Sequence, residues 1–276
     1  MRPIQPEMVR ARLLEASEDE GADIAEGALW IAALESPDLD IPHYLQWLDG
    51  VAERTAENAR RHASEGPSAA ILSDVLFHQI GFRGNDADYY DARNSYLNHV
   101  IERRRGIPIT LSVVYLAIAD RLGEDAAGID APGHFLVRHR DAIVDPFRGT
   151  RMTATELEAH LRSLEIREPE AETRSLLQQP PTRREILSRM LVNLRGIHVR
   201  HRDYPRALVT VDLLAHLDPS SPGWLRDRGV LYQRLECPEE ARADLERYLE
   251  EAPSAPDASA IREALGQLEQ LPRTLH

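Results

Sequence analysis

A histidine and an aspartate near the middle of the chain have the types and spacing of a general base and its orienting carboxylate. His134 opens one short apolar run and Asp145 closes the next, with Arg140 and Asp141 between the two runs. Two such runs joined by a tight turn predict a hairpin, which would bring the two side chains within hydrogen-bond reach. An imidazole held by a carboxylate can take a proton from a nucleophile, so this pair is the chain's first candidate for catalysis. A histidine beside apolar Phe135 also fits a satisfied core group.

The elements that would position this pair are an apolar helix followed by short strands. The segment Gly106–Gly123 reads GIPITLSVVYLAIADRLG, with Pro108 in the first helical turn and Gly123 at the end. The pattern then predicts a small antiparallel sheet. Its expected strands are 127–130, 133–139 and 142–145. Thr153 and Glu156 predict a capping box that opens a helix over 154–163.

The part of the chain before this helix predicts mostly further helices. Residues 7–62 and 68–80 carry helical apolar spacing, and we expect Asn94 to cap a helix over 95–105. The basic run at 103–105 fits a helix C-terminus, with Gly106 as the residue that ends it.

The loop over 81–93, with the residue after it, is polar and aromatic enough to suggest a peptide-binding groove. The candidate binding residues are Asn85, Tyr89, Tyr90, Asp91, Arg93 and Asn94. The alternative is that these side chains hold the backbone of their own loop.

The C-terminal part of the chain repeats with a period of 34 residues. Ala207 and Ala241 have this spacing, as do Pro219 and Pro253. This period, with a small residue inside each unit and a proline at its end, is typical of tetratricopeptide repeats, which are helical hairpins. We expect two repeats at 186–219 and 220–253, and a further helix near 257–270.

The predicted fold class is α+β followed by an all-α array. We expect a helical region and a core with a small antiparallel sheet over 1–165, a linker over 166–183, and the repeats over 184–276.

Composition narrows the classes of function. The net charge of −13 argues against a nucleic-acid binder, which needs a basic face for the phosphates. The single cysteine suits a reducing compartment, so we expect a cytoplasmic protein with no membrane span. The eleven histidines form no metal-binding motif, so we expect neither a metal nor a cofactor.

Three strings in the first two thirds of the chain are GFRGNDADYYDARNSYLN, the helix segment that follows it, and PGHFLV. In these strings the chain resembles the SirB type of bacterial protein, a family with a transglutaminase-like core and C-terminal tetratricopeptide repeats. The resemblance runs from about residue 23 to 270 and implies a core of papain-like topology. In active relatives of this superfamily a cysteine stands at the helix entry. His134 then matches the base and Asp145 the orienting acid.

This chain departs from that pattern at the nucleophile. Counting back from Gly123, the cysteine position falls on Pro108, and the chain's single cysteine, Cys237, lies in the repeats. The nearby hydroxyls are Thr110, on the third helical residue and expected near a pocket mouth, and Ser112, one turn beyond Pro108. Both hydroxyls could instead complete helix or core hydrogen bonds.

The leading hypothesis is therefore a non-catalytic regulatory protein that binds a protein or peptide partner through residues 184–276. The alternative is a hydrolase or acyltransferase that uses His134 and Asp145 with Thr110 or Ser112 as nucleophile. A third reading is a structural assembly factor without a functional pocket.

Overall fold

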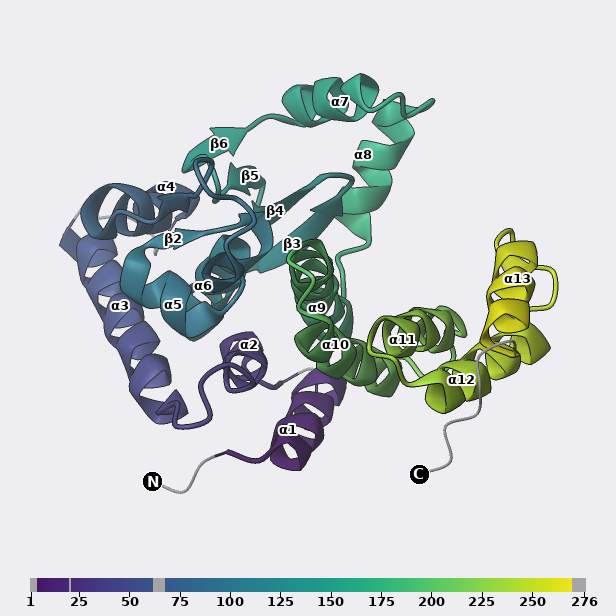
Figure 1. The fold of residues 1–276 in the computed structure, drawn as a ribbon. Helices are drawn as coiled ribbons and strands as arrows, with labels where there is room; N and C mark the ends of the chain where they lie inside the picture. Colours follow the sequence, from purple (N-terminus) through teal and green to yellow (C-terminus); the bar gives the residue numbers. More distant parts are fainter. Residues whose placement is uncertain (1–3, 20, 62–67, 270–276) are drawn as a thin grey trace. The chain divides into compact units, whose positions relative to one another are not determined.

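The computed structural model describes residues 4–19, 21–61 and 68–269 of the chain, which separates into two compact units, Met1–Met190 and Leu191–His276. The first unit opens with three helices, α1 (Pro6–Glu18), α2 (Ile24–Ala32) and α3 (Ile41–Arg61), as the helical spacing predicts (Figure 1). Helix α2 begins where the Asp23 side chain accepts a hydrogen bond from the Ala25 amide, and most of its residues are buried.

The predicted helix over 68–80 is present in two parts. It starts as α4 (Ala69–Ser73) and continues as the π-helical segment η1 (Asp74–Ile80). Gly81 ends it with a φ of 87°, a conformation that glycine adopts without strain. The loop that follows contains β1 (Arg83–Gly84) and the 3₁₀ turn η2 (Ala92–Asn94).

The helix expected over 95–105 is shorter than predicted, and both of its expected ends are wrong. Helix α5 spans Leu97–Arg103, and Tyr96 rather than Asn94 precedes its first turn. The left-handed residue at its end is Arg104, with a φ of 56°, so Gly106 does not end the helix. Gly106 lies instead in β2 (Arg105–Gly106), which pairs in parallel with β1.

Helix α6 (Pro108–Arg121) is the central helix of the first unit. Pro108 is its first residue, as predicted, and the side chains from Pro108 to Ala119 are all buried. A helix that is apolar on every side fits only where other elements surround it.

The predicted antiparallel sheet is present and has one more strand than expected. Its order is β3 (Ala126–Ala131), β4 (His134–His139), β5 (Ala142–Asp145) and β6 (Thr150–Met152). The register pairs Ile129 with Leu136 and Val137 with Val144. Strand β6 was not predicted, because its three residues are too few to show an alternating pattern.

The two faces of the sheet pack against different helices. Leu136 and Ile143 share a buried cluster with Leu157 and Leu161 of α7 (Ala154–Ser163). On the other face, the ring of His139 contacts Tyr115 of α6. Since side chains alternate along a strand, His134 lies on the same face as Leu136, toward α7.

The capping box predicted for α7 is confirmed, because Thr153 and Glu156 each accept a hydrogen bond from the other's backbone amide. The segment expected as a linker contains a helix, α8 (Pro169–Gln178). Leu176 and Leu177 of α8 pack against the cluster that α7 forms with the sheet.

The repeat helices confirm the 34-residue period. They are α9 (Arg183–Arg200), α10 (Tyr204–Leu217), α11 (Gly223–Arg234), α12 (Pro238–Glu251) and α13 (Ala258–Glu269), shown in green to yellow in Figure 1. The small residues at the repeat positions, Ala207 and Ala241, are fully buried, so the paired helices can approach closely. The structure therefore confirms the predicted fold class, an α+β core followed by helical hairpins.

Candidate functional site

The predicted pairing of His134 and Asp145 is present. His134 Nε2 lies 2.8 Å from Asp145 Oδ2, and their side chains are 12% and 0% exposed. The other carboxylate oxygen accepts hydrogen bonds from the amides of Phe147 (3.0 Å) and Arg148 (3.1 Å). These bonds fix the carboxylate, and the carboxylate in turn fixes the imidazole.

The surroundings keep Asp145 ionised. Burial by itself would raise the pKa of this carboxyl group, but the hydrogen bond and charge of His134 lower it, as do the Arg148 amide and guanidinium. The net result is a pKa below the usual aspartate value. A buried carboxylate held in this way can orient an imidazole without taking its proton.

Two rings that the sequence did not single out border His134. The Phe147 ring lies edge-on at 6.4 Å between centroids, and the His160 ring from α7 lies at 6.0 Å. His134 Nδ1 forms no hydrogen bond with any residue in the described part of the chain. Nδ1 is therefore the ring nitrogen that remains for a hydrogen bond to a group from outside the described residues.

The hydroxyls near the start of α6 are held by the backbone. Thr110 is fully buried rather than at a pocket mouth: its hydroxyl donates to the Asn94 carbonyl (2.7 Å) and accepts from the Ile107 amide (3.2 Å). Ser112 is also fully buried and donates to the Phe135 carbonyl at 3.4 Å. Neither hydroxyl bonds to His134, so this geometry favours the structural interpretation for both.

Three of the six loop candidates hold the loop together. The Asn94 side chain donates to the carbonyls of Asp88 (2.7 Å) and Tyr89 (3.2 Å) and accepts from Asn85 (3.0 Å). Asp91 accepts from the Arg93 amide and forms an ion pair with Arg103 at 2.9 Å. These contacts explain why Asn94 does not cap α5, because its amide group is used within the loop.

The other three loop candidates have exposed side chains. Arg93 is held against Asp91 but keeps a side chain that is 60% exposed. Tyr89 and Tyr90 are exposed and contact each other at 5.3 Å between ring centroids. Tyr89 also contacts Phe147 at 6.2 Å, so the loop reaches the ring that borders His134.

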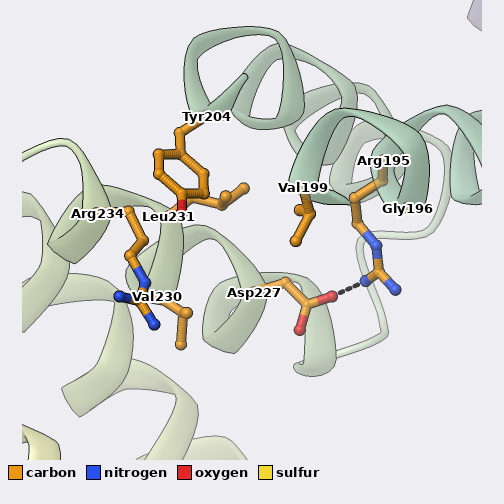
Figure 2. Close-up of a pocket in the computed structure, with 8 residues that line it drawn as sticks. All are labelled: Arg195, Gly196, Val199, Tyr204, Asp227, Val230, Leu231 and Arg234. Carbon is orange, nitrogen blue, oxygen red and sulfur yellow. Dashed lines mark hydrogen bonds and ion pairs between the residues drawn. The ribbon is translucent and has the colours of Figure 1, made fainter. Parts of the chain in front are cut away.

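A second candidate site lies within the repeats, where the sequence predicted a partner surface without naming residues. A cavity of about 350 Å³ opens between α9, α11 and the start of α10 (Figure 2). We call it the repeat groove. Its lining residues are Arg195, Gly196, Val199, Tyr204, Asp227, Val230, Leu231 and Arg234.

The repeat groove combines exposed apolar side chains with more positive than negative charge. Val199 and Val230 are 44% and 37% exposed, which is unusual for valine. Arg195 forms an ion pair with Asp227. The pKa of Arg195 is lowered, mainly by burial and to a smaller extent by the nearby charge of Arg226. Arg234 forms no hydrogen bond or ion pair with another described residue.

The structure shows no grouping of three or more potential metal-binding side chains among residues 4–19, 21–61 and 68–269. Within those same ranges, no helix has the length and apolar character needed to cross a membrane.

Comparison with known proteins finds a family model for each part of the chain. Residues 42–192 match the model of the transglutaminase-like superfamily, and residues 194–266 match a tetratricopeptide repeat model. A UPF0162 protein of Xylella fastidiosa is 36% identical over 255 residues, covering 90% of this chain and 91% of that protein. No solved structure gives a significant match.

Two more distant relatives differ in how much of the chain they share. Protein SirB1 of Salmonella typhimurium is 24% identical over 96% of this chain and 100% of its own length. F-box only protein 21 of Homo sapiens is 32% identical over 44% of this chain and 23% of its own length. These matches lead to one conclusion: the chain belongs to the transglutaminase-like superfamily, carries C-terminal tetratricopeptide repeats, and is similar over most of its length to UPF0162 proteins and to SirB1.

Proposed function

We propose that this protein is a non-catalytic, regulatory member of its superfamily that binds another protein through the repeat groove. The observation that carries the proposal is the groove itself, where two exposed valines and an arginine without a partner among the described residues line one cavity. Exposed apolar side chains gathered in a hollow are typical of binding surfaces rather than of ordinary surface. Helical repeats commonly use such surfaces for peptides and helices.

The region around α6 supports the non-catalytic part of the proposal. Pro108 stands where the superfamily resemblance places a nucleophilic cysteine, and proline offers no side-chain nucleophile. Thr110 and Ser112 donate their hydroxyl protons to backbone carbonyls. A hydroxyl becomes nucleophilic only when a base can take its proton, and neither hydroxyl hydrogen-bonds to His134.

One observation favours the second candidate, a hydrolase or acyltransferase. His134 is oriented by Asp145, and its Nδ1 forms no hydrogen bond with a described residue. Such an imidazole could accept a proton from a nucleophile that a substrate or a bound water brings. The loop tyrosines Tyr89 and Tyr90 would then lie close enough, through Phe147, to contact that substrate.

We also propose that the protein acts in the cytoplasm and that residues 184–276 form the binding region, after a core over 1–165. The single cysteine among 276 residues supports a reducing compartment.

The test uses the full chain with matched variants in affinity purification from its native cells. Val230→Asp places a charge in the repeat groove, and Val209→Asp places one at a similarly exposed valine that does not line the groove. We expect a partner that is retained by the wild type and Val209→Asp and is lost with Val230→Asp. Purified partner should then reproduce this order of binding. A partner retained equally by all three proteins would contradict the proposal.

A further inference from the structure

The repeat groove has a surplus of positive charge within an acidic protein. Of its charged side chains, Arg195 is paired with Asp227, whereas Arg234 has no acidic partner in the part of the chain described. The whole chain carries a net charge of −13, so an unneutralised guanidinium in a cavity stands out against the overall charge. A guanidinium in such a setting favours a carboxylate as its partner.

A second hydrogen-bond donor lines the same cavity. The Tyr204 hydroxyl forms no hydrogen bond with a described residue. Figure 2 shows the Arg195–Asp227 pair on one side of the groove, with Tyr204 and Arg234 toward the other. The unpaired donors therefore lie apart from the paired charges, and the two valines provide apolar surface in the same cavity.

Gly196 leaves room in this groove. A Cβ atom built on Gly196 would meet nothing within 4 Å, so the surface of α9 is open at this position. Together with the exposed valines, this space can take an aliphatic side chain from a partner.

We infer that the repeat groove binds an acidic–apolar peptide segment of a partner protein, with a carboxylate on Arg234 and Tyr204 and an aliphatic side chain over Val199 and Val230. The inference rests on the proposed function and names the chemistry of the partner. Charge complementarity excludes a basic segment, because it would bring a cation against Arg234. The apolar surface adds affinity that a carboxylate alone lacks.

The test is selection from a random library of short peptides displayed on phage, with the full-length protein as target. Parallel selections use Arg234→Glu, Val230→Asp and the control Arg247→Glu, which changes an exposed arginine of α12 outside the groove. Equal melting temperatures of the four proteins establish that each variant is folded. Light scattering on the wild type and Arg234→Glu reports whether a second copy occupies the groove.

We expect the wild type and Arg247→Glu to select peptides with Asp or Glu next to Leu, Ile or Val. Arg234→Glu should lower the affinity for these peptides by about tenfold or more, which is the effect of losing a charge-assisted hydrogen bond. This variant should select peptides with Lys or Arg instead. Val230→Asp should also lower the affinity for these peptides.

Three results would overturn the inference. If the selected peptides need Val230 for binding but show no preference for Asp or Glu, the proposed function holds but the inferred contact of a carboxylate with Arg234 and Tyr204 is wrong. Peptides that bind all variants equally would remove the groove, and the proposed function with it. A dimer of the wild type that Arg234→Glu dissociates would make a second copy the occupant.

Discussion

Asp145 is the side chain on which the geometry of the candidate site depends. It is fully buried, and its two oxygens accept hydrogen bonds from His134 and from the amides of Phe147 and Arg148. One carboxylate therefore fixes both the imidazole and the turn that carries Phe147. Removing one partner of a buried charged pair leaves the other unpaired, which is why such contacts are costly to break.

We expect Asp145→Ala to lower the free energy of unfolding by about 3 kcal/mol, because it strands His134 and two backbone amides. The pKa of Asp145 is lower in the folded protein than in the unfolded chain. Its contribution is therefore complete above the unfolded value of about 4, and it is lost as the pH falls through the folded value. Urea unfolding between about pH 7 and 3 measures this effect.

The control is Asp145→Asn, which keeps the shape of the side chain without the charge. Its stability should fall less steeply than that of the wild type below about pH 4. Parallel curves for the two proteins would show that the carboxylate charge does not stabilise the fold.

A second pH dependence of the free energy of unfolding is expected from His139, which is a basic group where Asp145 is an acidic one. Its Nδ1 lies 2.8 Å from the Tyr115 hydroxyl and its Nε2 lies 3.3 Å from a Glu124 carboxylate oxygen. Burial lowers the pKa of His139, although Glu124 opposes this effect. The unfolded chain therefore takes up the proton first, and stability should fall as the pH drops below about 6.5.

The measurement is the free energy of unfolding between about pH 7.5 and 5.5 for the wild type and His139→Gln. The variant should show the weaker dependence. If both proteins lose stability equally, the pKa of His139 does not differ between the folded and unfolded states, and other groups carry the effect.

At the scale of elements, two glycines of the repeats have opposite surroundings. Gly196 of α9 has open space where a Cβ would lie, whereas a Cβ on Gly229 of α11 would come within 2.7 Å of Leu245. The first glycine opens the repeat groove, and the second lets α11 and α12 approach closely. Neither has a positive φ, so the difference between them is one of space and not of backbone conformation.

Alanine at these two positions should therefore have opposite effects. Gly196→Ala should stabilise the repeats by about 0.5–1 kcal/mol, because alanine restricts the unfolded chain and favours the helix. Gly229→Ala should destabilise them by about 1–3 kcal/mol, because Leu245 or the helices must move. Denaturant unfolding of both variants gives the comparison, and a destabilising Gly196→Ala would mean that the groove is filled.

The elements that the sequence predicted well are those whose signals are local. The capping box of α7 depends on Thr153 and Glu156 alone, and both bonds are present. The start of α5 was wrong because Asn94 bonds to carbonyls in its own loop, a choice that depends on how the loop folds. Helix α8 was expected as part of a linker, because the segment ends near two consecutive prolines, which cannot continue a helix.

The candidate sites follow the same division. The pairing of His134 with Asp145 was predictable, because a short turn joins their strands. The contact of His134 with His160 was not, since it depends on how α7 lies on the sheet. The repeat groove also escaped prediction at the level of residues, because its walls come from different helices.

At the scale of the whole molecule, the relatives show that the two units occur together. The matching proteins of Xylella and Salmonella cover 90% and 96% of this chain, which includes both the core and the repeats. We propose that the repeats bind the partner and that the core, where the superfamily resemblance puts Pro108 at the nucleophile position, needs no chemistry for this binding. Binding should then be independent of the His134–Asp145 pair.

The most direct test of this central claim is photocrosslinking in native cells, with a photoreactive phenylalanine at position 230 of the full chain. We predict a discrete protein adduct from Val230 and none from the similarly exposed Val209, which lies outside the repeat groove. We also predict that His134→Ala leaves the yield of that adduct unchanged. Equal adducts from both positions would remove the repeat groove as the binding site. Loss of the adduct in a folded His134→Ala protein would place the function at the core, and either result would contradict the proposal.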